Sequence, residues 1–388
     1  MSSDRRWPRY GLLAGIGVCA LVGWFVARPF LAQTSLETLA SPAGPSQVRV
    51  PPGFAVNLFA GDLNGPRFIR FGPDGALYVA ERGADRILAL SDVDGDGVAE
   101  RRRVFAGDLN RPHSLAFHRR AWYVGVPSGV VRLEDGDGDG VAEQRQVLID
   151  DYPIFGHSTR TVEFLPDGRM VVSIGSSCNV CEESDPRRAA VVVYDGPQAT
   201  GERIFARGLR NAVGLAVHPT SGELWATNNG RDLLGDDLPP EAIYLLRDGA
   251  DYGWPRCHNG TIEDPDFGSP GACRGVAMPV VDMQAHSAPL GLVFYTGENF
   301  PAAYRGDLFI AFHGSWNRSV PTGYKVVRLP LDGSRPRGPV EDFATGWLDQ
   351  QGQTALGRPV GLAVGPDGAL YVSDDKAGMI YRIRYIRP

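Results

Sequence analysis

Basic and imidazole side chains recur at one point of a repeated pattern in this chain of 388 residues. Each copy begins with a polar or basic residue, continues as an apolar run, turns, and continues as a second apolar run. The residues near the first position are Arg67, His113, His157, Arg210 with Asn211, His286 and Arg358. Guanidinium groups bind carboxylates through paired hydrogen bonds, and imidazole accepts a proton near neutral pH. One such residue alone could be a solvated strand start, but together they predict an anion-binding pocket.

The repeats that carry these residues predict an all-β ring. Two strands of alternating polarity are joined by a turn, often Pro-Asp-Gly, which is the local signal of a β-hairpin. A third strand usually follows, as in RILAL from Arg86 and GVVRLED from Gly129. Such units bury their faces by packing radially, so six copies predict a six-bladed β-propeller with the strand starts at one mouth of its channel. We expect GFAVNLFA, from Gly53, to add an outer strand to the last blade and close the ring.

Composition agrees with this architecture. The 49 glycines and 30 prolines suit a chain with many tight turns, and a single large propeller accounts for the length without a second domain. The formal net charge is −6 and the basic residues are dispersed, so the chain lacks the footprint of a general nucleic-acid-binding protein. We expect a small-molecule partner and no nucleic acid.

The N-terminus predicts export. Arg5, Arg6 and Arg9 precede an apolar run over residues 11–27, which we expect to be helical. This pattern fits either a signal peptide or a short uncleaved membrane anchor. Both interpretations place the propeller in the periplasm or elsewhere outside the cytoplasm, and the second attaches it to the inner membrane. The predicted domains are a signal peptide or anchor at 1–32, a linker at 33–48 and the propeller at 49–388.

Four cysteines downstream of the apolar run form an even set. In an oxidising compartment disulfides are the default, and four cysteines allow three connectivities. Sequence proximity favours Cys178 with Cys181 and Cys257 with Cys273, each closing an extension of a blade. The CxxC could instead be a redox pair or part of a zinc site, but no second CxxC supports zinc and no CxxCH supports covalent haem.

Two acidic segments, DVDGDGVAE and DGDGDGVAE, have the composition of calcium loops. Carboxylates at alternate positions with glycines between them can wrap several oxygens around a hard cation. The candidate ligands are Asp92, Asp94, Asp96, Glu100, Asp135, Asp137, Asp139 and Glu143. The acidic residue at the ninth position excludes an EF-hand, whose Glu stands at the twelfth. We expect both loops at the outer rim, either with a structural calcium ion or as plain acidic turns.

Several longer motifs carry a family resemblance. They are His157 at the start of the third blade, GSSCNVC from Gly175, ARGLRNAVGLAVHP from Ala206, DGADYGWP from Asp248 and HGSWNRSVPTGYKVV from His313. In these the chain resembles the pyrroloquinoline quinone (PQQ) dependent sugar dehydrogenases, specifically the L-sorbosone dehydrogenase branch, from about Pro51 to the C-terminus. The GLRN and YGWP motifs are the specific ones, since many propellers carry PDGALYV.

The resemblance implies PQQ lying flat over the channel mouth, with a calcium ion bridging cofactor and protein. It implies that His157 is the base that takes a proton from the substrate hydroxyl while hydride passes to the quinone. The residues that it implies around PQQ are Arg210, Asn211, Arg318 and Arg358. Where the family has a glutamine near the substrate this chain reads LNRPH, so Asn110, Arg111 or His113 would do that work.

The same resemblance implies that backbone carbonyls at Gly230 and Arg231 hold the cofactor calcium. This chain has a longer acidic loop there, NNGRDLLGDD, so Asp232, Asp236 and Asp237 could contribute carboxylates instead or be plain loop residues. After His157 the chain also departs from the glucose dehydrogenases, in which an arginine stands one residue later than Arg160. A preference for glucose therefore does not follow from the resemblance.

Two other functions use the same scaffold. A calcium-dependent sugar lactonase needs Glu, Asn and Asp side chains on one metal, whereas the strand starts here are mostly Arg and His. A non-catalytic binding module would present only a surface, and the fold alone does not exclude it. The convergence of His157, Arg210, Asn211 and Arg358 favours PQQ- and calcium-dependent oxidation of a sugar, aldehyde or related alcohol. No nicotinamide fingerprint or fused haem is present, so we expect a separate periplasmic or membrane electron acceptor.

Overall fold

The computed structural model describes residues 37–38, 47–349 and 351–386. The predicted export segment, with its apolar helix at 11–27, and most of the predicted linker lie outside these residues. Within the part of the chain that the structure describes, no helix has the length and apolar character needed to cross a membrane.

Six sheets of four or five strands form the blades of the propeller, as the hairpin repeats predicted. Blade 1 contains β3 (Pro66–Phe71), β4 (Leu77–Glu81), β5 (Arg86–Ser91), β6 (Arg101–Ala106) and β1 (Glu37–Thr38). Blade 2 contains β7 (Ser114–His118), β8 (Ala121–Val126), β9 (Gly129–Glu134) and β10 (Gln144–Ile149). Blade 3 contains β11 (Arg160–Phe164), β12 (Met170–Ile174), β13 (Ala190–Tyr194), β14 (Arg203–Arg207) and β18 (Ala250–Asp251).

The second half of the ring is built in the same way. Blade 4 contains β15 (Leu215–Val217), β16 (Leu224–Asn228), β17 (Glu241–Leu246) and β21 (Val281–Met283). Blade 5 contains β22 (Pro289–Phe294), β23 (Leu308–Phe312), β24 (Lys325–Leu329) and β27 (Glu341–Ala344). Blade 6 contains β28 (Pro359–Val364), β29 (Leu370–Asp374), β30 (Met379–Tyr385) and β2 (Phe54–Ala60).

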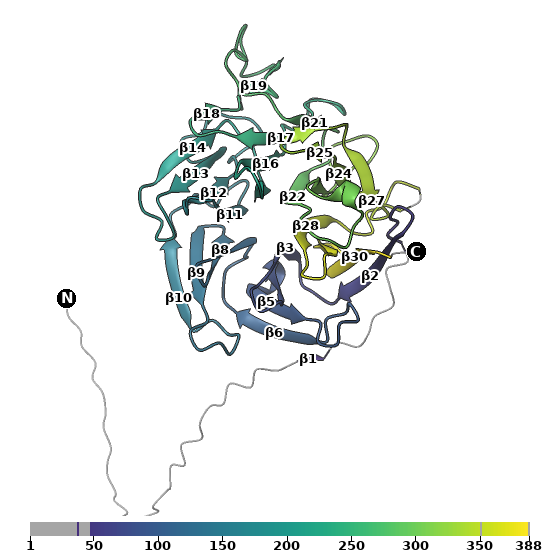
Figure 1. The fold of residues 1–388 in the computed structure, drawn as a ribbon. Helices are drawn as coiled ribbons and strands as arrows, with labels where there is room; N and C mark the ends of the chain where they lie inside the picture. Colours follow the sequence, from purple (N-terminus) through teal and green to yellow (C-terminus); the bar gives the residue numbers. More distant parts are fainter. Residues whose placement is uncertain (1–36, 39–46, 350, 387–388) are drawn as a thin grey trace, which may run out of the picture. The chain divides into compact units, whose positions relative to one another are not determined.

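The ring closes between the two ends of the propeller sequence. Strand β2 pairs antiparallel with β30, with Phe54 opposite Tyr385, so the prediction for GFAVNLFA is confirmed. Figure 1 shows this closure as the purple strand beside the yellow one, and shows the blades arranged around a centre. Neighbouring inner strands contact one another all round that centre, as β3 does with β7 and β28. The starts of the inner strands therefore share one end of the channel, which we call the mouth.

Packing between blades forms the core. Blade 2 contributes Tyr123 and Val130 to a buried cluster with Val172 and Val192 of blade 3, and each further blade pair has a similar cluster. Within a blade, the Pro-Asp-Gly turns work as expected: Gly75, between β3 and β4, has φ +79°, a conformation that suits glycine. The repeated hairpins thus form the blades, and the packing of the blades into a ring brings the starts of the inner strands together at the mouth.

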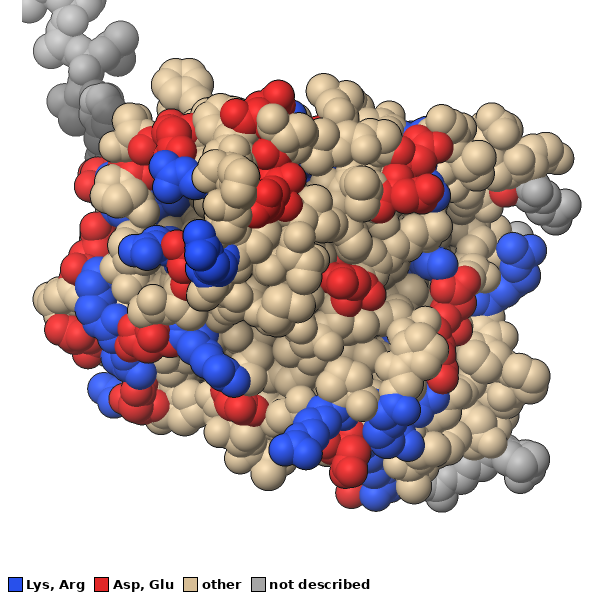
Figure 2. Space-filling model, turned by 90° about the horizontal axis from the view of Figure 1, so that it is seen from above, with Lys and Arg blue, Asp and Glu red and all other residues tan. Residues whose placement is uncertain are grey.

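Two small hairpins extend from the blades. They are β19 (Cys257–His258) with β20 (Ile262–Glu263), and β25 (Leu331–Asp332) with β26 (Arg335–Pro336). Single turns of 3-10 helix, η1 (Arg82–Ala84) and η2 (Ala302–Tyr304), interrupt the loops. Both predicted disulfides are present: Cys257–Cys273 closes the first extension, and Cys178–Cys181 closes a turn after β12. Figure 2, a view at 90° to Figure 1, shows basic and acidic side chains interspersed on that face.

Candidate active site at the channel mouth

The predicted site residues lie at or just before the inner strands. Arg67 is the second residue of β3, and Arg358 directly precedes β28. His157 stands three residues before β11, and Asn211 stands in the loop that leads to β15. The repeat therefore brings these side chains to the mouth, but into two separate hydrogen-bonded groups.

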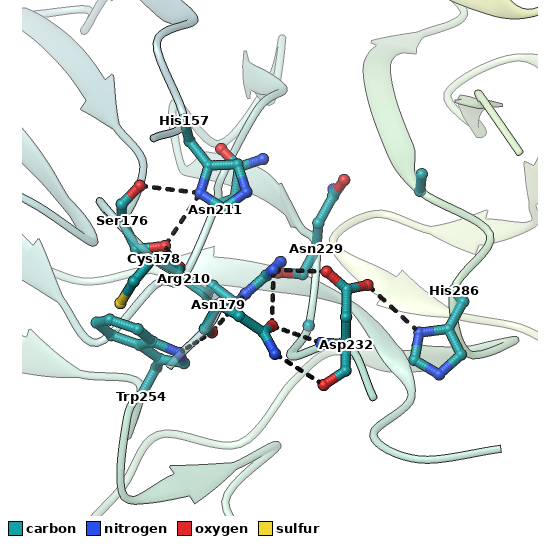
Figure 3. Close-up of polar contacts among 12 residues, drawn as sticks. His157, Ser176, Cys178, Asn179, Arg210, Asn211, Asn229, Asp232, Trp254 and His286 are labelled. Atoms are coloured by element: carbon teal, nitrogen blue, oxygen red, sulfur yellow. Dashed lines mark hydrogen bonds and ion pairs between the residues drawn. The ribbon is translucent and has the colours of Figure 1, made fainter. Parts of the chain in front are cut away.

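His157 belongs to the first group, and its surroundings fix its tautomer. Its Nδ1 lies 3.0 Å from both the carbonyl oxygen and the hydroxyl oxygen of Ser176. The Ser176 hydroxyl donates to the carbonyl of Cys178 at 2.6 Å, so both Ser176 oxygens present acceptors to the ring. Nδ1 therefore carries the proton, and Nε2 keeps its lone pair. Figure 3 shows this contact between His157 and Ser176.

The charge state of His157 suits a base. Burial, the positive charge of Arg210 and, more weakly, the charges of Arg188 and Arg160 lower its pKa to about 4, although the Ser176 carbonyl opposes the shift. The imidazole is therefore neutral at neutral pH. Among the described residues, Nε2 makes no hydrogen bond, and the side chain is only half-buried. A proton acceptor in this position is ready without first losing a proton.

Two buried arginines hold the loop that carries His157. Arg160 donates to the carbonyls of His157 at 2.9 Å and Pro153 at 2.7 Å. Arg188 donates to the same Pro153 carbonyl at 2.7 Å and to the Gly175 carbonyl at 3.0 Å. Arg160, which stands one residue earlier than the corresponding arginine of the glucose dehydrogenases, is fully buried and supports the loop from the protein interior.

Arg210 and Asn211 lie beside His157. The Arg210 side chain is buried and donates to Asp232 at 2.8 Å, to the Asn229 carbonyl at 3.3 Å, and to both oxygens of Asn179 at 2.9 and 3.0 Å. Its guanidinium group is therefore held rigidly, with most of its N–H groups already bonded. On the far side of Asp232, His286 Nδ1 lies 3.9 Å from the carboxylate, as Figure 3 shows.

Gly175 explains how closely His157 and Asn211 approach. A Cβ at Gly175 would lie 2.6 Å from the Cβ of His157 and 2.5 Å from Oδ1 of Asn211. Real side chains do not tolerate such contacts, so a glycine is required here for steric reasons. The GSSCNVC motif thus supplies the space in which the two functional side chains meet.

The second group joins blades 5, 6 and 1. Asp375 accepts a hydrogen bond from His313 Nε2 at 2.9 Å and forms an ion pair with Arg67. Burial alone would raise the pKa of Asp375, but the His313 hydrogen bond and the Arg67 charge lower it to about 2. Arg358 donates to the carbonyls of His313 at 3.1 Å and of Gly314 at 2.9 Å. Its Nη1 makes no hydrogen bond with the described residues, so Arg358 has N–H groups to spare.

His113 lies beneath the mouth instead of on it. The side chain is fully buried, its Nδ1 accepts from Arg67 at 3.3 Å, and its Nε2 has no partner among the described residues. Burial and the charge of Arg67 put its pKa well below 6.5, so it is neutral. Arg111, by contrast, is exposed, with φ +57° and its backbone N–H bonded to Asp85 at 2.5 Å.

Arg318 lies on the loop after β23 and faces the acidic loop of blade 4. Its guanidinium donates to the Asp236 carbonyl and, at 2.9 Å, to the Asp237 carboxylate. One of the carboxylates considered as calcium ligands, that of Asp237, thus pairs with Arg318, while the Asp236 carboxylate accepts from the Ser319 N–H at 2.9 Å. Trp316 on the same loop is exposed.

The three residues assigned to the cofactor calcium point in different directions. The Gly230 N–H donates to Glu241 at 2.7 Å, the Arg231 side chain pairs with Asp264 and Asp266, and Asp232 pairs with Arg210. Burial raises the pKa of Glu241 to about 7, against the effect of the Gly230 N–H. In the described ranges, compact carboxylate clusters lie instead on the rim loops.

Those rim loops connect β5 to β6 and β9 to β10, at the outer part of blades 1 and 2. In each, ligand oxygens of all four predicted carboxylates lie within 4.8 Å of one another: Asp92, Asp94, Asp96 and Glu100 in the first, and Asp135, Asp137, Asp139 and Glu143 in the second. The loops fold alike: Gly95 N–H donates to Asp92 at 2.7 Å, and Gly138 N–H donates to Asp135 at 2.6 Å.

A cavity of about 480 Å³ occupies the channel further along the inner strands. Its lining includes Leu115, Val162, Leu292 and Leu362, and no predicted site residue. Only Arg70 and Glu163, which pair at 2.5 Å, bring charge to it. The predicted site residues therefore lie at the mouth and not in this cavity.

The residues at the mouth fit an anionic quinone such as PQQ. Arg358 has free N–H groups for a carboxylate, whereas Arg210 and Arg67 are held in place by ion pairs with Asp232 and Asp375 that balance their charges. His157 presents a neutral Nε2, and Gly175 leaves room beside it. A multiply negative ligand with one reactive face matches this set of donors.

Sequence patterns missed several residues of the site. Ser176 and Asn179 are in the GSSCNVC segment, which contributed to the resemblance and to the disulfide prediction without indicating a role for these two residues, and Asp375 follows a β-strand like many surface acids. The pair Asp374-Asp375 at the end of β29, the second strand of blade 6, was the one available signal. Arg188 has none, since it is one of many dispersed arginines.

Fold and site together define a class: a six-bladed propeller with a neutral histidine and fixed arginines at its mouth. The family model "Domain of unknown function (DUF7133)" matches residues 43–382, and the chain belongs to this family. An uncharacterized protein of Borreliella burgdorferi is 30% identical over 366 residues, covering 90% of this chain and 93% of its own length.

Two further relatives come from the fungus Coprinopsis cinerea. The pyrroloquinoline quinone-dependent pyranose dehydrogenase is 28% identical over 421 residues, covering 91% of this chain, which spans only 57% of that enzyme. The solved holo form of the pyranose dehydrogenase PQQ domain has a TM-score of 0.78 and 25% identity, covering 88% of this chain and 98% of that domain. The relatives thus include PQQ-dependent sugar dehydrogenases, but they do not confirm the L-sorbosone branch of the resemblance.

Proposed function

We propose that this protein is an extracytoplasmic PQQ- and calcium-dependent dehydrogenase of sugars, with aldoses or the sugar aldehyde sorbosone as candidate substrates. The observation that carries the proposal is the neutral His157 beside Arg210 and Asn211. Support comes from the PQQ-dependent sugar dehydrogenases among the relatives and from the two disulfides, which are typical of oxidising compartments.

In this proposal His157 is the general base. Its Nε2 lone pair accepts the proton of the substrate hydroxyl, and the developing imidazolium is stabilised by the Ser176 oxygens at Nδ1. PQQ, when bound, supplies the carbonyl carbon that accepts hydride. Arg358 and Arg210 would hold its carboxylates, with Asn211 beside the base, and Arg318 would close the opposite side. Bound calcium, through carbonyls near Gly230–Asp232, would add positive charge.

Electrons leave this site for a second protein. The proposed acceptor is a separate protein or quinone of the periplasm or membrane. Arg111 is exposed at the mouth, where it could contact substrate, whereas His113 acts through Arg67, because it is fully buried.

The test is reconstitution of the purified protein with PQQ and calcium. We expect aldoses, sorbosone or polyols to bleach the oxidised cofactor's absorbance with the wild type. His157→Ala should bind PQQ but reduce it about 10²–10⁴-fold more slowly, the usual contribution of a general base. Failure to bind PQQ in the presence of calcium would reject the proposal in favour of a lactonase or a binding module.

A further inference from the structure

The Cys178–Cys181 disulfide closes a four-residue turn directly against the site. It follows β12, with Cα atoms 6.2 Å apart, and encloses Asn179 and Val180. Nothing in the proposed chemistry uses its sulfur atoms. The turn nevertheless bonds directly to the arginine of the first hydrogen-bonded group and reaches the base through Ser176, as Figure 3 shows.

Asn179, inside this turn, bonds with all of its polar side-chain atoms and with its carbonyl. Its Oδ1 accepts from Arg210 at 3.0 Å and from the Asp232 N–H at 2.8 Å, and its Nδ2 donates to the Asp232 carbonyl at 3.0 Å. Its carbonyl accepts from Arg210 Nε at 2.9 Å and from Trp254 Nε1 at 3.4 Å. One residue thus aligns the ion pair between Arg210 and Asp232.

Cys178 acts on the other side of the turn, toward the base. Its carbonyl accepts the Ser176 hydroxyl at 2.6 Å. Because that hydroxyl donates to Cys178, its oxygen is left as an acceptor for Nδ1 of His157, 3.0 Å away. The position of the Cys178 carbonyl therefore helps to decide which ring nitrogen of His157 carries the proton.

We propose that the Cys178–Cys181 turn is the positioning element of this site. The disulfide restricts the backbone of the turn so that Asn179 fixes Arg210, and the Cys178 carbonyl, through Ser176, keeps the Nε2 lone pair of His157 facing the mouth. The cross-link is needed because this segment lies outside the β-ladders: β12 ends at Ile174 and β13 begins at Ala190. This inference rests on the proposed function for its catalytic meaning, but not for its geometry.

The test compares two pairs of cysteine variants. Cys178→Ser with Cys181→Ser opens the turn, whereas Cys257→Ser with Cys273→Ser opens the other disulfide, on the extension hairpin, as the matched control. The first readout needs no cofactor: ¹⁵N chemical shifts of the His157 ring in the apo-protein. We expect one tautomer, with unprotonated Nε2, in the wild type and the control, and a mixture of tautomers in the first pair.

The second readout is the dissociation constant for PQQ. We expect at least a tenfold weakening in the first pair and less than a twofold change in the control, since a loosened Asn179 no longer aligns Arg210. A folded first pair with one tautomer and wild-type PQQ affinity would overturn the inference. If the wild type binds no PQQ, the proposed function fails, while the tautomer measurement still decides the positioning role.

Single substitutions keep the inference testable if the first pair does not fold. Ser176→Ala removes the oxygen between His157 and Cys178, and Ser177→Ala is its neighbouring control, because the Ser177 hydroxyl bonds to Glu183 at 2.7 Å. The Ser176 carbonyl remains an acceptor for Nδ1 in Ser176→Ala, so we expect the Nδ1-protonated form to stay in the majority and a minor population of the other tautomer to appear only in this variant. Asn179→Ala should weaken PQQ binding at least tenfold with the His157 tautomer unchanged. Wild-type behaviour of both Ser176→Ala and Asn179→Ala would overturn the inference.

Discussion

At the residue scale, protonation of His157 should set the lowest pH at which the protein is active. Its pKa is lowered to about 4, first by burial and then by Arg210, so the neutral base persists well below the ordinary value of 6.5. We expect kcat/KM to stay level from pH 7 to about 5 and to fall tenfold per pH unit only below about 4, measured under conditions in which the protein stays folded. The same lowered pKa makes protonation unfavourable in the folded state, so His157 reduces stability as pH falls from about 6.5 to about 4.

The histidine signals of the apo-protein provide the control for this profile. The His157 ring proton, assigned by its loss in His157→Gln, should titrate near pH 4. A midpoint near 6.5 in both experiments would show that neither burial nor Arg210 controls this group.

A second prediction at the residue scale concerns Gly175. In Gly175→Ala the new methyl would overlap the Cβ of His157 and Oδ1 of Asn211, so both side chains must move. Displacement of a base by about 1 Å costs on the order of 10²-fold in rate, and we expect that loss in kcat/KM. Gly107→Ala is the matched control, because a Cβ there has nothing within 4 Å. Equal activity of the two variants would contradict this role of Gly175.

The site residues at the repeat starts and the residues that bond to them differ in how far the sequence could predict them. His157, Arg210, Asn211 and Arg358 could be singled out because each stands at a repeat start, and the repeat carries its own position. Their partners could not. Arg67 also stands at a repeat start, but its partner Asp375 is 308 residues away in the chain, so only the closed ring brings the two together.

At the scale of elements, the hairpin repeats could be predicted from the sequence because their signals are local: alternating strands and glycine-containing turns act within a few residues. The conformations of the loops between blades could not be predicted, since they depend on contacts with other loops. The acidic loop after β16 shows this difference. The sequence left its carboxylates as either metal ligands or plain loop residues and gave no sign of their pairing, in which Asp232 bonds Arg210 and Asp237 bonds Arg318.

The acidic rim loops should bind calcium with a measurable gain in stability. Each brings four carboxylates together at the rim, and a cation removes their mutual repulsion. We expect calcium to raise the Tm of the apo-protein, since a ligand that binds only the folded state stabilises it by mass action. Asp92→Asn with Asp94→Asn should remove one equivalent of calcium in titration calorimetry, and Asp135→Asn with Asp137→Asn another. Unchanged stoichiometry in both variants would identify the loops as plain acidic turns.

At the scale of the whole molecule, the propeller depends on the strand that joins its two ends. Phe54 at the start of β2 packs its ring against Phe300 at 4.8 Å, Tyr385 at 5.1 Å, Phe343 at 5.2 Å and Tyr304 at 5.3 Å. These rings belong to blades 5 and 6, so one side chain ties the N-terminal strand to the last two blades. Closure of the ring is therefore an energetic property of packing as well as of the β2–β30 ladder.

Phe54→Ala should weaken that closure. Loss of a fully buried phenylalanine costs about 3–5 kcal/mol, and the half-buried Phe54 should cost about 2–3 kcal/mol in the free energy of unfolding measured with urea. Phe155→Ala is the control, because Phe155 is 80% exposed and its removal should change stability by less than about 0.5 kcal/mol.

If the ring opens locally before it unfolds, amides of β2 and β30 in Phe54→Ala will exchange with solvent faster than those of blade 3. Uniform exchange across the blades would show instead that the propeller unfolds as one unit and that its closing strand is no weaker than the rest.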